Sequence, residues 1–173
     1  MTSMDPSPAL PEKRIQAAPS SVLVVDDEPD FRELFAYYLG KMGHTVSFAE
    51  NGEEALARLR RDPCDLVLLD LRMPVMDGLE LIRQLRAEPA LAGLKIISAS
   101  ALAYPEDRAA TQQAGADEFI AKPIQLREFF HKLARLTGAV DGPVVPAALP
   151  ASPADTAQII QWLQVPSALW RGQ

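Results

Sequence analysis

The sequence predicts an α/β protein with a doubly wound parallel sheet, and two observations support this fold class. Between Ser21 and about Gly138, short apolar segments alternate with segments whose apolar residues follow a helical period. Five such units can be counted, and this alternation is typical of parallel strands joined by crossover helices. Three of the short segments are apolar throughout, as expected of strands that helices cover on both faces.

The first helix has the clearest pattern and lies between the first two expected strands. The five expected strands are Val22–Val25, Thr45–Ala49, Leu66–Leu69, Leu94–Ala99 and Glu118–Ala121. After the first strand, six apolar residues recur at the spacing of one helical face, namely Phe31, Leu34, Phe35, Tyr38, Leu39 and Met42. Gly43 follows them and predicts the end of this helix.

The second and third helices have recognisable ends. The second is expected from Gly52 to about Arg61, with Asn51 as its N-cap, because the Asn51 side chain can accept from the amide of Glu54. The third is expected to follow Asp77-Gly78, and Pro89 marks its end. Its apolar face is formed by Leu79, Ile82 and Leu85.

The fourth helix has the weakest signal, and the fifth has a strong one. The fourth is expected to start near Pro105, a residue favoured in the first helical turn, and its apolar face depends on Ala110 and Ala114. The fifth is expected over Ile124 to Thr137. Its apolar side consists of Leu126, Phe129, Phe130, Leu133 and Leu136.

Composition excludes several classes of protein. The 173 residues are 48% hydrophobic, and no apolar run reaches the roughly 20 residues that a membrane-spanning helix needs. Residues 1–20 lack the apolar region of a secretory signal, so we expect a cytoplasmic protein with no membrane contact. A net charge of −6 argues against nucleic-acid binding, which usually requires a basic face. The single cysteine, Cys64, excludes an internal disulfide and is expected to be a small buried residue.

Polar residues follow four of the expected strands, at the ends where ligands bind in open α/β sheets. They are Asp26 and Asp27 after the first strand, Asp70 after the third, Ser100 after the fourth and Lys122 after the fifth. Because the carboxyl ends of parallel strands lie at one edge of the sheet, we expect these side chains to converge although they are far apart in the chain. This convergence predicts a functional site.

Three of these residues are carboxylates, which predicts a bound cation. Clustering Asp26, Asp27 and Asp70 would cost several kcal/mol in mutual repulsion unless a cation neutralised them. Mg²⁺ fits best because it takes one or two carboxylates together with water and phosphoryl oxygens, whereas Ca²⁺ usually needs more protein oxygens. Zn²⁺ is disfavoured because both histidines, His44 and His131, are expected to lie away from this edge.

Four segments of the sequence resemble one family. They read VLVVDDEPDFRELFAYYL, DLVLLDLRMPVMDGLELI, KIISASA and ADEFIAKPI. Together they resemble the receiver domain of two-component response regulators, from Ser21 to about Gly138, and in particular the stand-alone type found in chemotaxis regulators. The resemblance implies a flavodoxin-like sheet of strand order 2-1-3-4-5 with helices on both faces.

The resemblance also implies the roles of the residues that would handle a phosphoryl group. Asp70 would be the phosphoacceptor, whose carboxylate attacks a phosphohistidine, and Ser100 and Lys122 would contact the phosphoryl oxygens. Phe119 would act with Ser100 as a switch, turning from exposed to buried when Ser100 moves inward. The bond between Lys122 and Pro123 would be cis, the isomer that aims the lysine.

The same resemblance implies a set of metal ligands. Asp27 and Asp70 would bind Mg²⁺ directly, Asp26 would do so largely through water, and the backbone carbonyl of Arg72 would complete the protein ligands. Arg72 and Leu102 occupy variable positions beside the site and are expected to influence the lifetime of the acyl phosphate. Beyond its own phosphoryl transfer and autodephosphorylation, we expect no enzymatic activity.

The sequence outside the receiver region suggests a division into four parts. We expect a flexible extension over residues 1–20, the receiver over 21–138, a Pro/Ala-rich linker over 139–154, and a tail over 155–173 with a short helix candidate. Only one basic residue, Arg171, follows Gly138, so a DNA-binding output is not expected.

Three functions remain open at this point. The first is a signalling receiver that takes its phosphoryl group from a histidine kinase or histidine phosphotransfer protein and contacts an effector, with phosphorylation-dependent dimerisation as a further option. The second is a phosphorelay intermediate or phosphate sink without an effector. The third is a Mg²⁺-dependent phosphohydrolase, which Arg72 disfavours because that class typically carries a second Asp two residues after its nucleophile.

Overall fold

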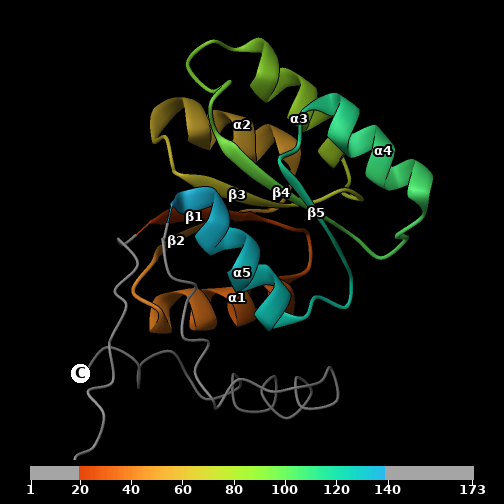
Figure 1. The fold of residues 1–173 in the computed structure, drawn as a ribbon. Helices are drawn as coiled ribbons and strands as arrows, with labels where there is room; N and C mark the ends of the chain where they lie inside the picture. The colour runs from red at the N-terminus through yellow and green to blue at the C-terminus, as the bar shows by residue number, and fades with distance from the viewer. Residues whose placement is uncertain (1–19, 139–173) are drawn as a thin grey trace, which may run out of the picture.

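The computed structural model describes residues 20–138 (Figure 1). Five strands form one parallel sheet in the order β2-β1-β3-β4-β5, which confirms the predicted fold class. They are β1 (Ser21–Val25), β2 (Thr45–Ala49), β3 (Leu66–Asp70), β4 (Lys95–Ser100) and β5 (Glu118–Ala121). The proposed linker and tail, and the proposed N-terminal extension apart from Ser20, lie outside the described residues.

Five helices alternate with the strands of the described region and cover both faces of the sheet. They are α1 (Pro29–Lys41), α2 (Gly52–Arg61), α3 (Gly78–Ala87), α4 (Pro105–Ala114) and α5 (Leu126–Thr137). Figure 1 shows α1 and α5 on one face and α2, α3 and α4 on the other. No helix within residues 20–138 combines the length and apolar character needed to cross a membrane.

The sheet is buried on both faces, and the side-chain alternation of its strands divides the core into two clusters. In β1, Val22 and Val24 pack with α1 and α5, whereas Leu23 and Val25 pack with α2 and α3. The large buried side chains of the first cluster include Phe35, Leu39, Phe129 and Phe130, and those of the second include Leu59, Leu81, Ile82 and Leu85. This arrangement explains why the central strands are apolar throughout.

Two helices begin at side-chain caps. The Asn51 side chain accepts from the amide of Glu54 at 2.9 Å, as expected, while the Glu54 carboxylate accepts from the amide of Glu50. The Asp77 side chain accepts from the amide of Glu80 at 2.9 Å and caps α3. These caps satisfy amides that have no partner within the helix.

The structure corrects the expected details of α4 and α5. Helix α4 begins at Pro105, as expected, and Ala114 packs partly buried against the core. Its fully buried residue, however, is Thr111, whose hydroxyl donates to the carbonyl of Arg108 at 2.9 Å. A threonine can be buried in this way because a carbonyl of its own helix satisfies its hydroxyl. The last helix begins at Leu126 rather than at Ile124.

Candidate functional site

An acidic cluster lies at the carboxyl edge of the sheet. The carboxylate oxygens of Asp26, Asp27 and Asp70 lie within 4.8 Å of one another. The register explains this proximity, because β1 and β3 are adjacent and Val25 pairs with Leu69, so the residues that follow them are neighbours. We call these three aspartates the acidic pocket.

The ammonium group of Lys122 reaches the acidic pocket from the end of β5. Its Nζ lies 2.8 Å from Asp26 Oδ2 and 3.6 Å from Asp70 Oδ2. The Lys122 amide donates to the carbonyl of Ser100 at 2.8 Å, and the bond from Lys122 to Pro123 is cis, the isomer expected from the sequence. The backbone at the end of β5 therefore directs this side chain across two strands.

Burial and charge together set the protonation behaviour of the pocket. Burial raises the pKa of Asp70 above its ordinary value, and the charges of Asp26 and Asp27 add to this, while Lys122 and the amide of Arg72 oppose it. Burial alone would lower the pKa of Lys122, but its hydrogen bond to Asp26 and the surrounding carboxylates outweigh burial and raise that pKa. The ammonium form of Lys122 is therefore stabilised in the pocket.

Groups that the sequence analysis did not single out hold Asp26 in place. The carboxylate of Asp26, which is fully buried, accepts from the amide of Glu28 at 2.9 Å. Its carbonyl accepts from Arg32 Nη1 at 2.7 Å, and Arg32 also pairs with Glu50 at 3.1 Å. Because α1 begins at Pro29, residues of its first turn must lie beside the end of β1, and this position could have identified Arg32.

The backbone packs closely under Asp70. Asp70 Oδ1 accepts from the amide of Arg72 at 3.2 Å, which orients the carboxylate. A Cβ at Gly78 would lie 2.6 Å from the backbone oxygen of Asp70, so this close approach requires glycine. In the same loop Val75 has φ +70°, a left-handed conformation that is strained for a β-branched residue.

The Ser100 hydroxyl is buried and bound to the loop that follows it. It donates to the carbonyl of Leu102 at 3.1 Å, and it accepts from the amide of Leu102 at 3.2 Å. Ser100 is 1% exposed. The hydroxyl therefore links the end of β4 to the loop that leads into α4, and it would exchange these bonds if it turned toward the pocket.

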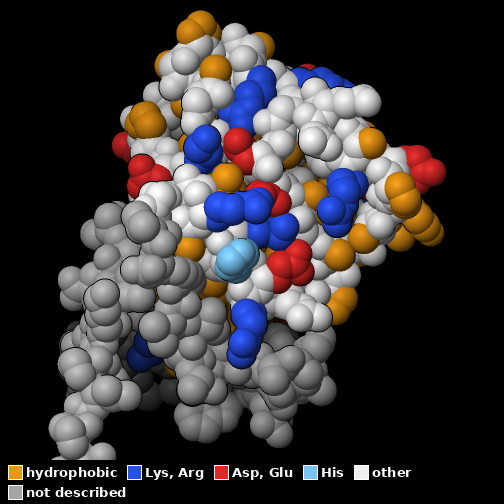
Figure 2. Space-filling model, in the orientation of Figure 1, with side chains coloured by type: hydrophobic (Ala, Val, Ile, Leu, Met, Phe, Trp, Pro, Cys, Tyr) orange, Lys and Arg blue, Asp and Glu red, His pale blue; other side chains and the backbone are white. Residues whose placement is uncertain are grey.

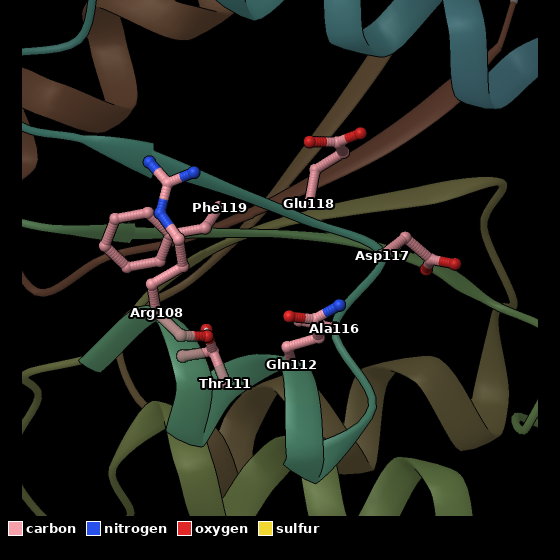
Figure 3. A pocket seen from close by; sticks show the side chains of 7 residues that line it. All are labelled: Arg108, Thr111, Gln112, Ala116, Asp117, Glu118 and Phe119. Atoms are coloured by element: carbon pink, nitrogen blue, oxygen red, sulfur yellow. The ribbon is translucent and has the colours of Figure 1, made fainter. Parts of the chain in front are cut away.

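Phe119 is already buried in this structure, with 6% of its surface exposed, and belongs to the core cluster beside α2 and α3. The guanidinium carbon of Arg108 lies 5.2 Å from the centre of the Phe119 ring. Figure 3 shows both side chains at the edge of a hollow of about 250 Å³ between α4 and β5. The buried position of Phe119 is one of the two between which the family resemblance implies that it turns.

The acidic pocket fits a divalent cation with oxygen ligands. Three carboxylates and one ammonium leave a formal charge of −2, which matches Mg²⁺ or another hard divalent ion. Neither histidine contributes a ligand to the acidic pocket. His44 directly precedes β2, and its Nδ1 accepts from the amide of Ser20, whereas His131 is exposed on α5. The donor set therefore favours Mg²⁺ over Zn²⁺.

A family model and a curated relative both match most of the described region. The family model of the response regulator receiver domain matches residues 22–134. An uncharacterized 14.6 kDa protein of Leptolyngbya boryana is 40% identical over 107 residues, which cover 62% of this chain and 82% of that protein.

Longer relatives match over only part of their length. A gliding motility regulatory protein of Myxococcus xanthus is 41% identical over 101 residues, which cover 58% of this chain and 13% of that protein. The transcriptional regulatory protein ResD of Bacillus subtilis is 40% identical over 113 residues, covering 65% of this chain and 46% of ResD. The chain thus spans less than two thirds of these relatives.

Solved structures share the fold over nearly their whole length. A putative response regulator from Chloroflexus aurantiacus has a TM-score of 0.67 and 28% identity, with coverage of 69% of this chain and 98% of that one. The chemotaxis protein CheY4 of Vibrio cholerae has a TM-score of 0.65 and 28% identity, with coverage of 69% and 99%. The likeness therefore covers the five-stranded sheet together with its helices.

Proposed function

This chain belongs to the response regulator receiver domain family, and from that premise we propose that it accepts a phosphoryl group on Asp70 and signals through phosphorylation-dependent protein contacts. The observation that carries the proposal is the acidic pocket with Lys122 reaching into it from another strand. Membership of the family implies a histidine kinase as partner. A histidine phosphotransfer protein would serve the same purpose.

In the proposed reaction, a carboxylate oxygen of Asp70 attacks the phosphorus of a phosphohistidine. A new P–O bond forms while the P–N bond breaks, and the electron pair of that bond stays on the imidazole nitrogen. Lys122 would stabilise the charge that spreads over the phosphoryl oxygens, and the amide of Arg72 already orients the attacking carboxylate. The protein supplies positioning and electrostatics for its own modification, so it is not a classical enzyme.

Magnesium is the cofactor that we propose for this pocket. Asp26, Asp27 and Asp70 would hold it, with the backbone carbonyl of Arg72 as a further ligand, and it would neutralise charge on the carboxylates and the phosphoryl group. The chain's own residues would then orient the phosphoryl group, with the Ser100 hydroxyl released from Leu102 to contact it.

The signal would leave through the region that joins β4, α4 and β5. Because Ser100 is bound to the β4–α4 loop, its movement would release that loop and change the packing of Arg108 and Phe119. An effector protein, or a second copy of the chain, would recognise the altered surface. The single cysteine is compatible with a reducing compartment, and we place this exchange in the cytoplasm.

The experiment that tests the proposal is a measurement of intact-protein mass after incubation with acetyl phosphate. The natural protein should gain one phosphoryl group only when Mg²⁺ is present, and Asp70→Asn should gain none. Asp62→Asn is the matched control, because Asp62 lies at the exposed end of α2 and pairs with its neighbour Arg61. No gain by the natural protein, or an equal gain by Asp70→Asn, would overturn the proposal.

A further inference from the structure

Phe31 connects the acidic pocket to the hydrophobic core. The sequence pattern places it on the apolar face of α1, yet its side chain is only partly buried. Its ring centre lies 4.6 Å from that of Phe35, which is 1% exposed and in turn makes an edge contact with Phe129 at 5.0 Å. The Phe31 ring is thus fixed on one side by a row of buried aromatic side chains.

The other side of this ring contacts the functional lysine. Lys122 Nζ lies 4.4 Å from the centre of the Phe31 ring, within the range of about 6 Å in which a cation–π attraction is effective. An ammonium group has three N–H donors. One of them donates to Asp26 at 2.8 Å, Asp70 Oδ2 lies 3.6 Å away as an ion-pair partner, and the Phe31 ring is a further neighbour of the group.

We propose that Phe31 is a positioning residue that holds the Lys122 ammonium over the acidic pocket for phosphoryl transfer. This inference rests on the proposed function of Asp70. The carboxylates that contact Lys122 are also the expected ligands of a cation, so their attraction to the lysine is shared. The ring carries no formal charge, so it attracts the ammonium without neutralising it. Lys122 therefore keeps one partner that needs no exchange when a phosphoryl group enters.

The contact with Lys122 requires an aromatic side chain at position 31. A leucine would fill much of the same space and preserve the packing against Phe35, but it would lack the π-electrons that attract the ammonium. A partly desolvated cation–π contact corresponds to about a tenfold effect on a rate that depends on it. Phe31→Leu should therefore slow the gain of phosphoryl from acetyl phosphate about tenfold, and Phe31→Tyr should restore most of the natural rate.

Two comparisons separate positioning from a general loss of structure. Tyr37→Leu is the matched control on the same helix, because the Tyr37 ring lies 5.6 Å from Lys41 Nζ, and its rate should stay near the natural one. In a Lys122→Ala background, Phe31→Leu should change the remaining rate less than twofold, because the group that the ring holds is gone. An undiminished effect of Phe31→Leu in that background would overturn the inference.

NMR spectroscopy can test the contact between Lys122 and the Phe31 ring in the unphosphorylated protein. The NMR signals of the Lys122 ε-methylene protons should be shifted upfield by the Phe31 ring, and this shift should vanish in Phe31→Leu and persist in Phe31→Tyr. Absence of the shift in the natural protein would overturn the inference even if Asp70 is phosphorylated. A normal shift in a protein that gains no phosphoryl group would instead overturn the proposed function, and with it the role of Phe31 in transfer.

Discussion

The acidic pocket and the charged surface around β5 contain similar residues but balance their charge differently. In the pocket, three carboxylates lie beside one ammonium group, which pairs with Asp26 and Asp70. Around β5, Asp117 pairs with Arg86 at 3.0 Å and Lys95 at 3.8 Å, and Glu118 pairs with Lys132 at 2.9 Å and with Arg135. We call this second set the β5 charge network, and Figure 2 shows basic and acidic side chains interleaved over that face.

The comparison shows that the functional site differs from the rest of the charged surface by having more carboxylates than cationic partners. In the β5 charge network each carboxylate has at least one cationic partner, and the Asp117 side chain also accepts from the amide of Ile96 at 2.8 Å. Such a network contributes to stability without a ligand. The pocket instead keeps uncompensated negative charge beside a buried Asp26, which favours a bound cation.

The largest expected effect tests how tightly the pocket is packed. Gly78→Ala should lower the free energy of unfolding by about 3 kcal/mol, because its Cβ would overlap the backbone oxygen of Asp70 and neither backbone can give way easily. Urea denaturation would measure this change. Gly93→Ala is the control, since a Cβ there meets no atom within 4 Å, and a similar loss in both variants would refute the close-packing argument.

The next prediction contrasts two aspartates, one from each region. Asp117→Asn should lower the free energy of unfolding by about 2 kcal/mol, because it weakens charged hydrogen bonds to Arg86 and to the amide of Ile96. Asp27→Asn should raise it by about 0.5 kcal/mol in the absence of Mg²⁺, because one of three repelling carboxylates is removed. Thermal unfolding with and without Mg²⁺ would measure both.

Added Mg²⁺ should reverse the stabilisation expected for Asp27→Asn. The natural protein should gain stability as Mg²⁺ is added, because a ligand that binds the folded state stabilises it. Asp27→Asn should gain less than the natural protein, whereas Asp117→Asn should gain the same amount. If both variants were destabilised equally and responded equally to Mg²⁺, the distinction between the two regions would be wrong.

An effect smaller than that of Asp117→Asn is expected in the loop between β3 and α3. Val75 is 73% exposed and has φ +70°, so its side chain contributes little packing to offset its backbone strain. Val75→Gly should raise the free energy of unfolding by about 1 kcal/mol, whereas Val75→Ala should recover less of the strain because it keeps a Cβ. Chemical denaturation of both variants would show whether the pocket loop stores strain.

The smallest expected effect is a pH dependence of stability that arises from His44, outside the acidic pocket and the β5 charge network. Burial lowers the pKa of His44 below its ordinary 6.5 and outweighs a backbone contact with Ser20 that acts in the opposite direction. The unfolded chain binds a proton on His44 more readily than the folded chain does. The contribution of neutral His44 to the free energy of unfolding is therefore present above pH 6.5, and it is lost as the pH falls through the lowered pKa of the folded state.

Unfolding curves measured at decreasing pH, starting from pH 7, would test whether stability falls on acidification. The natural protein should lose stability over this interval, and His44→Gln should lose less. His131→Gln serves as the control, because His131 is exposed on α5, and it should follow the natural protein. A natural protein that gained stability on acidification through this interval would contradict the prediction.

Most of the fold could be predicted from the sequence because its signals are local. The apolar period of α1 and the cap at Asn51 depend on neighbours within a few residues. The weak pattern of α4 placed its start at Pro105 correctly. It missed the burial of Thr111, because apolar spacing cannot show that a carbonyl of the same helix satisfies this hydroxyl. The roles of Asp70, Ser100, Lys122 and Phe119 in phosphoryl transfer and switching stay predictions.

The sequence by itself determined the order of elements and the chemistry at the strand ends, because parallel strands bring their carboxyl ends to one edge whatever lies between them. Tertiary structure alone decided which partners those residues have. The apolar stripe of α1 assigns Phe31 to the core, but only the packing of α1 against β1, β2 and α5 places its ring beside Lys122. Such contacts join residues far apart in the chain, and their geometry depends on how whole elements are oriented in space.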